Sequence, residues 1–389
     1  MASENAHNTK ILYLHIGTPK TGTTLLQKFF ILNRALLKKN GICYPDSLLD
    51  DGKQENDRNG NMYPIANDII DERFYCGLDA IKKIFETESK ILLSEEHFWE
   101  LNDKSFRLEE LKKVVDEIKL IVYLRRQDLY VESFWNMFIG LGVGTTRNKN
   151  SCKEYLLEAF KTHYYEELES ISEIVGMNNI YVRIFEKQQL VNENICDDFL
   201  HIMQCDKFHF NTLEQERVNE SFDEKILEIK DVFNDVRNVE GVDWHNLENL
   251  FFNRAFREVN RKYGSNKSCL FTLGEREEIM QEYLEENEKL AEKYLKRKNG
   301  ILFYEKLGET TFRENYWGEN AIDILMLTRI IAEIFASQQK KIIELENRLN
   351  NQHTRIMRIE KIVMEREKIN SKNCRSLLEK LFRKRGTLR

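Results

Sequence analysis

The sequence has 389 residues, of which 41% are hydrophobic and 11% aromatic, enough apolar material for a large core. The formal net charge is −6, whereas a general nucleic-acid binder usually carries a basic excess, so we expect no nucleic-acid partner. No apolar run approaches the roughly 20 residues that span a bilayer, and the first ten residues lack the apolar core of a signal peptide. The seven cysteines are scattered without a C-x-x-C pair, which favours reduced thiols. We therefore expect a globular cytoplasmic protein.

The first part of the chain alternates between two kinds of apolar pattern. Longer helical patterns, such as those of residues 24–40 and 196–204, lie between short apolar runs rich in β-branched residues. Such runs are typical of strands that are buried on both faces of a parallel sheet. They occupy residues 10–16, 90–94, 119–124 and 180–185. The order predicts an α/β fold in which right-handed crossovers connect a parallel sheet flanked by helices.

From residue 219 onward the pattern becomes mostly helical, for example over residues 221–238 and 274–298. These helices are expected to cover the sheet or to wall an acceptor site. Only three prolines occur, and no Gly/Ser-rich linker interrupts the chain before residue 310. We therefore predict that residues 1–310 form one domain.

Residues 320–370 carry a different signal, an apolar seam with alternating spacings of three and four. The seam predicts a coiled coil or long helix and a homo-oligomer, and the alternative is a surface helix packed back on the domain. The polar Gln352 on an inner position does not by itself distinguish a dimer from a trimer. The seam consists of Ile342, Leu345, Leu349, Gln352, Ile356, Ile359 and Val363.

Residues 372–389 form a basic tail in which seven Lys or Arg side chains accompany the single carboxylate of Glu379. Leucines and a phenylalanine are interleaved with these charges, as in a short amphipathic helix on an anionic membrane surface. The sequence leaves two readings open, a peripheral contact at the inner face of the membrane and a solvated basic terminus.

The stretch LHIGTPKTGTT, residues 14–24, follows the first predicted strand and opens a predicted helix. Such a loop directs backbone N–H groups toward an anion at the positive end of the helix dipole. In the nucleoside-triphosphate loop G-x-x-x-x-G-K-[ST] the lysine follows the second glycine, but here Lys20 precedes Gly22. A triphosphate–magnesium ligand would lose its main electrostatic anchor, and Lys20 would instead face an atom transferred away from the bound nucleotide.

The loop resembles the 5′-phosphosulfate-binding loop of the PAPS-dependent sulfotransferases, in the form found in bacterial carbohydrate-type members. The resemblance covers about residues 9–305 and implies a P-loop-like fold that binds PAPS (3′-phosphoadenosine-5′-phosphosulfate) and releases PAP. It implies donor contacts from the loop itself; the alternative is a threonine-rich turn that merely caps a helix. The loop residues concerned are Pro19, Lys20, Thr21, Gly22, Thr23 and Thr24.

A second element of that family places an arginine at the end of a strand and a serine eight residues later. Here Arg125 and Ser133 have this spacing, and the resemblance implies that both bind the 3′-phosphate. Arginine suits this role because its planar fork binds phosphate oxygens bidentately. The alternatives are an ion-pair arginine and an ordinary helix serine, and Arg126 could exchange roles with Arg125.

Sulfuryl transfer needs a group on the leaving oxygen and a base for the acceptor hydroxyl. The resemblance gives Lys20 the first role, requires no metal, and points to the end of the 90–94 strand for the base. Glu96 is the first choice there, followed by His97 and Glu95, with a residue elsewhere such as His15 left open. The alternative is that Glu95 and Glu96 have no catalytic role and only begin a helix, where the positive end of the helix dipole favours acidic side chains.

The sequence thus predicts a cytosolic, bacterial-type sulfotransferase whose acceptor is a carbohydrate hydroxyl of a polysaccharide, lipid-linked glycan or glycolipid. The acceptor class rests on the family resemblance alone. Two alternatives remain, a nucleotide-dependent kinase with the same loop architecture and a coiled-coil scaffold with an inactive nucleotide-binding head.

Overall fold

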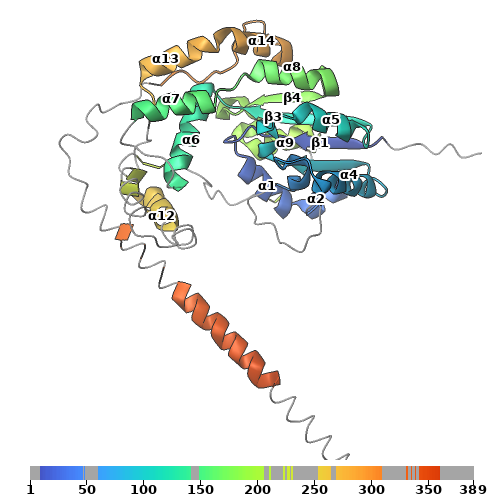
Figure 1. The fold of residues 1–389 in the computed structure, drawn as a ribbon, viewed down its shortest axis with the longest axis vertical. Coiled ribbons are helices and arrows are strands. Elements are labelled where there is room, and N and C mark those ends of the chain that lie inside the picture. The colour runs from blue at the N-terminus through green and yellow to red at the C-terminus, as the bar shows by residue number, and fades with distance from the viewer. Residues whose placement is uncertain are drawn as a thin grey trace, which may run out of the picture. The chain divides into compact units, whose positions relative to one another are not determined.

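The computed structural model describes two compact units, and it places residues 9–46, 48, 60–141, 149–205, 210–211, 222–223, 226–227, 229–230, 253–263, 269–308, 330–331, 334, 338 and 341–359. The first unit comprises residues 1–234 and 265–319, and the second comprises residues 235–264 and 320–389. Figure 1 shows the elements of both.

The first unit is built on a parallel four-stranded sheet with the order β2-β1-β3-β4. All four predicted strands are confirmed, as β1 (Ile11–His15), β2 (Lys90–Ser94), β3 (Glu117–Leu124) and β4 (Ile180–Ile184). Strand β1 is central and its last residue pairs with Ser94 and Ile121. The carboxyl ends of β1, β2 and β3 therefore meet at one edge, where ligands of open α/β sheets bind.

Helices cover both faces of this sheet, because alternate strand residues are apolar on each side. One core joins the sheet to α4, α5, α8 and α14, and the other joins it to α1 and α9. The three-layer α/β/α arrangement confirms the predicted fold class. The described helices of this unit are α1 (Thr23–Leu32), α2 (Arg34–Lys39), α3 (Tyr63–Ala66), α4 (Glu72–Ile84), η1 (Glu96–Glu100), α5 (Lys104–Lys112), α6 (Gln127–Leu141), α7 (Lys149–Ala159), α8 (Tyr164–Val175), η2 (Met177–Asn179), η3 (Lys187–Gln189), η4 (Val191–Glu193), α9 (Ile195–Ile202), α13 (Leu273–Glu282) and α14 (Leu284–Leu295).

Two stretches whose sequence pattern predicts one continuous helix each form two helices in the structure. The pattern over 24–40 breaks at Asn33, whose amide side chain donates to the Phe29 and Asn211 carbonyls and accepts from the Asn211 amide. The pattern over 274–298 breaks at Tyr283. A side chain that bonds to the backbone, as Asn33 does, competes with helix continuation, and apolar periodicity does not reveal this.

The second unit contains α12 (Asn253–Tyr263) and a helix over residues 341–359. The latter lies within the predicted 320–370 segment, while most of residues 221–238 and all of the basic tail lie outside the described residues. None of the described helices combines the length and apolarity needed to cross a bilayer.

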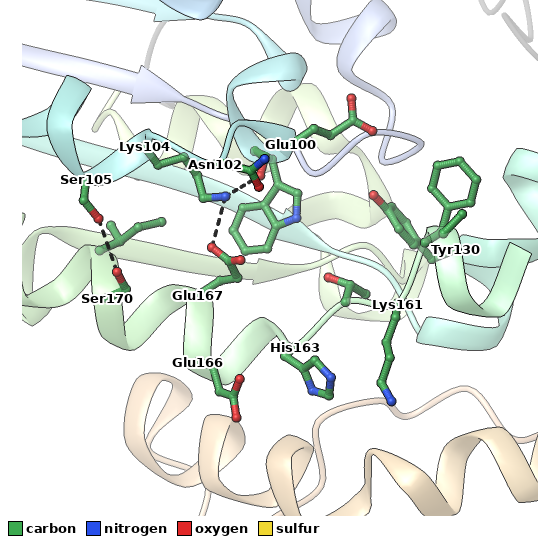
Figure 2. A pocket seen from close by; sticks show the side chains of 15 residues that line it. Glu100, Asn102, Lys104, Ser105, Tyr130, Lys161, His163, Glu166, Glu167 and Ser170 are labelled. Atoms are coloured by element: carbon green, nitrogen blue, oxygen red, sulfur yellow. Dashed lines mark hydrogen bonds and ion pairs between the residues drawn. The ribbon is translucent and has the colours of Figure 1, made fainter. Parts of the chain in front are cut away.

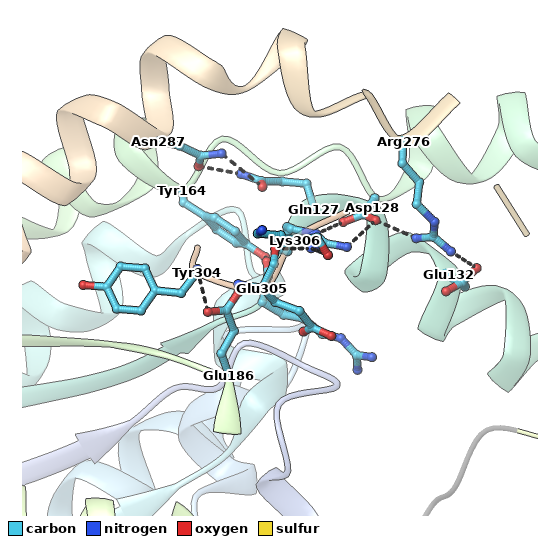
Figure 3. Close-up of polar contacts among 12 residues, drawn as sticks. Gln127, Asp128, Glu132, Tyr164, Glu186, Arg276, Asn287, Tyr304, Glu305 and Lys306 are labelled. Atoms are coloured by element: carbon cyan, nitrogen blue, oxygen red, sulfur yellow. Dashed lines mark hydrogen bonds and ion pairs between the residues drawn. The ribbon is translucent and has the colours of Figure 1, made fainter. Parts of the chain in front are cut away.

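A buried ion-pair network fastens α6 to α13 at the same edge of the sheet (Figure 3). Asp128 is fully buried and accepts both Nε and Nη2 of Arg126, at 2.6 and 3.0 Å, together with Nη1 of Arg276 at 2.5 Å. Arg276 also donates to Glu132 at 2.7 Å. Gln127 is hydrogen-bonded to Asn287 on α14, which extends the fastening to that helix. The start of α6 is therefore held in place by the segment that follows residue 270.

Replacing Asp128 with alanine should destabilise the protein by about 3–5 kcal/mol, because two buried guanidinium groups lose their shared carboxylate. Urea unfolding followed by far-UV circular dichroism measures this loss. Glu285→Ala is the matched control, since it removes a carboxylate whose ion pair with Lys289 is exposed, and it should have little effect. Equal stability of the two variants would show that the network does not stabilise α6.

Candidate functional site

The loop between β1 and α1 adopts a backbone that few residues allow. Gly17 and Gly22 have φ values of +97° and +82°, and a Cβ atom on Gly17 would lie 3.1 Å from the Glu96 Cβ. Lys20 also has a positive φ, 66°, which is costly for a side chain of its size. The loop is therefore held in an unfavourable backbone conformation against the first residue of η1.

Hydrogen bonds to β3 keep the loop in this conformation. The Thr18 amide donates to the Tyr123 carbonyl at 2.9 Å, and the Tyr123 amide donates to the Gly17 carbonyl at 2.7 Å. The Thr18 hydroxyl also donates to the Tyr123 carbonyl, and the Thr21 hydroxyl donates to the Thr18 carbonyl at 2.6 Å. Thr21 is fully buried and its hydroxyl stabilises the loop, so a contact from Thr21 to PAPS would use its backbone amide.

The start of α1 offers the backbone groups that an anion would use. Gly22 caps the helix without a side-chain hydrogen bond, so no side chain satisfies the N–H groups of the first turn. Thr23 is buried and Thr24 is partly exposed beside them. Pro19 is buried in the loop and has no N–H to donate. The available donors are therefore the amides after Lys20 and the positive end of the helix dipole.

Arg125 joins the loop to the second predicted motif. Its Nη1 donates to the Lys20 carbonyl at 2.8 Å, and this is its only guanidinium hydrogen bond among the described residues. Burial lowers the pKa of the guanidinium, and within the described part of the chain Arg125 forms no ion pair. The nearby carboxylates of Glu132 and Asp128 offset part of this effect through their charge, and the remaining guanidinium N–H groups can donate to a bound anion.

Arg126, the alternative to Arg125, has a different role. Besides its bidentate bond to Asp128, it donates to the Glu305 carbonyl at 2.8 Å, and it is 5% exposed. Its side chain is therefore fixed in the network at the start of α6. The two neighbouring arginines thus have different partners: Arg126 bonds Asp128 and the Glu305 carbonyl, whereas Arg125 bonds the Lys20 carbonyl in the loop.

Lys20 lies against α6, the helix that carries Ser133. The Lys20 ammonium lies 2.7 Å from the Met137 sulfur and 5.4 Å from the centre of the Phe134 ring. Met137 lies four residues after Ser133, one turn along the same helix face. Ser133 is partly exposed and its hydroxyl donates to the Tyr130 carbonyl at 2.8 Å. The hydroxyl oxygen can still accept a hydrogen bond, and the hydroxyl can rotate to donate to a different acceptor. The structure thus brings Lys20, Arg125 and Ser133 to one edge of the sheet.

Glu96 is the candidate base that faces the loop. It is the first residue of η1, it is partly exposed, and its Cβ lies against the backbone of Gly17. Its Oε2 accepts a hydrogen bond from Nε2 of Gln27, on the second turn of α1, at 2.9 Å. Gln27 therefore orients the Glu96 carboxylate beside the loop.

The other candidate bases are engaged elsewhere. Nε2 of His97 contacts Asp68 at 2.7 Å and its Nδ1 contacts Glu100 at 3.1 Å, so both ring nitrogens are occupied away from the loop. Although partial burial opposes it, these two carboxylates raise the pKa of His97. His15 is fully buried, bonds Ser94 through Nδ1, and burial lowers its pKa to about 3, which makes it a poor proton acceptor at neutral pH.

Glu95 is the buried neighbour of Glu96. It is 7% exposed, and burial, reinforced by the charge of Glu96, raises the pKa of its carboxyl to about 7. Its Oε2 has no hydrogen-bond partner among the described residues, while Oε1 accepts the His97 amide at 3.5 Å. Gly60 lies beside the end of β2, where a Cβ atom on it would be 1.6 Å from the Ser94 carbonyl oxygen. Two adjacent carboxyls thus occupy environments of opposite character at the end of β2.

A polar cavity of about 560 Å³ lies beside η1, between the amino-terminal ends of α5 and α8 (Figure 2). It includes none of the residues predicted for the donor site, yet it begins with Trp99 and Glu100, within the same short helix as Glu96. It is lined by Trp99, Glu100, Asn102, Lys104, Ser105, Tyr130, Ala159, Phe160, Lys161, Thr162, His163, Glu166, Glu167, Ser170 and Ile171. No cluster of His, Cys, Asp or Glu that could hold a metal ion occurs within the described ranges.

Two residues of the site were missing from the sequence-based prediction. Gln27 follows Thr23 by four residues, so its place on the same face of α1 was a usable signal. Tyr164, at the start of α8, donates its hydroxyl to the Arg125 carbonyl at 2.8 Å. Nothing in the sequence links two residues that lie 39 positions apart in this way.

Comparison with known proteins adds one partial similarity. No family model matches the chain. A curated protein of Archaeoglobus fulgidus, described as an uncharacterized protein, is 25% identical over 202 residues. The match covers 48% of this chain and 49% of that protein, so the chain spans about half the length of the relative it matches. The function must therefore be argued from the site.

Replacing Glu95 with glutamine should flatten the dependence of stability on pH between about 5 and 8. Folding raises the Glu95 pKa from 4.5 to about 7, so the folded state binds this proton more tightly and loses stability as pH rises through that range. The full loss is on the order of 3 kcal/mol. Urea unfolding at pH 5 and pH 8 measures it, and the exposed Glu166→Gln is the control that should keep the wild-type slope. An unchanged slope in Glu95→Gln would contradict the assignment.

Proposed function

We propose that this protein is a sulfotransferase that moves a sulfuryl group from PAPS to an acceptor hydroxyl. The observation that carries the proposal is the bond from Arg125 to the Lys20 carbonyl, which joins the two predicted donor motifs. We also propose that β1, the loop and α1 form a P-loop-like phosphate site. The similarity to the Archaeoglobus fulgidus protein neither supports nor opposes this assignment.

The residues present fit a donor with two separate anionic groups. The amides at the start of α1 suit the 5′-phosphosulfate, because Gly17 and Gly22 allow the positive-φ backbone that forms the loop ahead of the helix. Arg125 lacks a carboxylate partner among the described residues, and with the Ser133 hydroxyl it suits a 3′-phosphate. When bound, PAPS supplies an activated sulfuryl group attached to a phosphate leaving group.

Two side chains of the protein would take part in the transfer itself, Lys20 at the leaving group and Glu96 at the acceptor hydroxyl. The Lys20 ammonium now contacts a methionine sulfur, a weak acceptor that an anionic oxygen would readily replace. In that position it would stabilise the negative charge that develops on the leaving phosphate. Glu96 would accept the proton of the acceptor hydroxyl, with Gln27 holding its carboxylate in place. Glu95 and His97 stay behind Glu96 as buried and outward-facing neighbours.

The acceptor that we propose is a carbohydrate hydroxyl. The reacting hydroxyl would lie between Glu96 and Lys20, and further sugar units could extend along η1 into the polar cavity that starts at Glu100. Hydroxyl, amide and carboxylate side chains line that cavity, and they suit the many hydroxyl groups of a sugar.

PAP should raise the melting temperature of the purified protein, while ATP with magnesium and 5′-AMP should not. A ligand that binds only the folded state at several hundred times its dissociation constant adds about 3–4 kcal/mol of stability. Differential scanning fluorimetry measures the shift, which Arg125→Ala should abolish. Stabilisation by ATP with magnesium alone would place the nucleotide-dependent kinase ahead of the sulfotransferase.

Glu96→Gln should lower kcat by at least about 100-fold, since general-base catalysis contributes roughly 10²–10⁴. The PAP-induced shift should stay close to wild type, because Glu96 does not contact the donor phosphates in this proposal. Release of PAP in the presence of candidate acceptor sugars provides the assay. Full turnover in Glu96→Gln, with loss of turnover in His97→Gln, would transfer the base role to His97.

A further inference from the structure

The helix over residues 341–359 carries an exposed apolar seam. Five seam residues, spaced by alternating steps of three and four, are between 47% and 66% exposed. An aliphatic stripe of this length on a helix normally lies against another helix. The five residues are Ile342, Leu345, Leu349, Ile356 and Ile359.

The spacing assigns every residue a heptad position. Ile342, Leu349 and Ile356 occupy a positions, and Leu345, Gln352 and Ile359 occupy d positions. Isoleucine at two of three a positions favours two strands over three or four. In a parallel in-register pair each seam residue meets its own copy, so the Gln352 amides could bond to each other, one as donor and one as acceptor.

The flanking charges specify the partner and its direction. The g positions are all basic, with Lys341, Arg348 and Arg355, whereas the e positions hold Glu346, His353 and Glu360. In a parallel coiled coil each g side chain faces the e side chain of the following heptad on the partner. Lys341 would then meet Glu346 and Arg355 would meet Glu360, two attractive pairs for each copy.

An antiparallel pair would bring g against g and e against e. Basic g side chains, such as Arg348 and Arg355, would then meet one another, which like-charge repulsion opposes. A foreign helix would need its own matching seam and charges, whereas this seam is complementary to itself.

We propose that the helix over residues 341–359, continued in the sequence by Glu360, forms a parallel, in-register, two-stranded coiled coil with a second copy of this chain. The proposal does not depend on the sulfotransferase assignment, because it uses only the seam and its flanking charges. Because the coil is parallel, both copies of the segment that precedes it join the same end of the coil.

The first test is the mass of the full chain in solution, by sedimentation equilibrium. We expect a dimer, and a reversal of the two attractive g positions, Lys341→Glu with Arg355→Glu, should raise its dissociation constant at least tenfold. Adding Glu346→Lys and Glu360→Lys should restore the dimer, because the pairs re-form with exchanged signs. Arg358→Glu, at an outer c position, is the matched control and should leave the dimer intact.

A monomeric or trimeric wild type, or a dimer indifferent to the reversal, would overturn the proposal. A variant that dissociates without rescue by the second pair would indicate damage to the helix and would also count against the charge argument. Far-UV circular dichroism and the melting temperature of each variant identify such damage.

The second test addresses direction through engineered cysteines. Ile342→Cys lies at one end of the seam, so only a parallel in-register pair brings two copies of it together for oxidation to a disulfide-linked dimer. Thr354→Cys, at the outward f position, should not cross-link, and wild type controls for the seven native cysteines. Absence of cross-linking in Ile342→Cys, in a protein that is dimeric, would exclude the parallel in-register arrangement.

Discussion

The hydrogen bond from the Arg125 guanidinium to the Lys20 carbonyl is the contact on which the candidate site depends. It joins the residue after β3 to the middle of the loop after β1, across neighbouring parallel strands. Lys20 has an unfavourable positive φ, and this bond, together with those between Thr18 and Tyr123, holds its backbone in place. Arg125 has further N–H groups beside this bond, so one side chain contributes both to the conformation of the loop and to the charge of the site.

The fold around that contact was largely predictable because its signals are local. Buried parallel strands appear as short β-rich runs, and a glycine-flanked loop between strand and helix follows from spacing alone. The sequence did not predict which of Arg125 and Arg126 is bound within the fold. Arg126 is, because it bonds Asp128 and the Glu305 carbonyl, and Glu305 lies far along the chain. The bond from the Thr21 hydroxyl to the Thr18 carbonyl was not predictable either, because it forms only when the loop closes on itself.

The two consecutive glutamates that follow β2, Glu95 and Glu96, lie in different environments. Glu95 points into a buried environment where its proton is retained to about pH 7, whereas Glu96 points to the loop and is oriented by Gln27. Two carboxyls whose surroundings differ in this way are a recurrent feature of acid–base sites.

The parallel pairing proposed for the helix over residues 341–359 has a consequence for the size of acceptor that the protein would favour. A parallel pair connects both copies of the preceding chain to the same end of the coil, so two donor sites would share one assembly. Two tethered sites increase the effective concentration of a polymer that carries many equivalent hydroxyls, but they add nothing for a small monovalent acceptor. If the coil and the sulfotransferase activity are both present in this chain, a repetitive glycan is the acceptor for which their combination has a physical advantage.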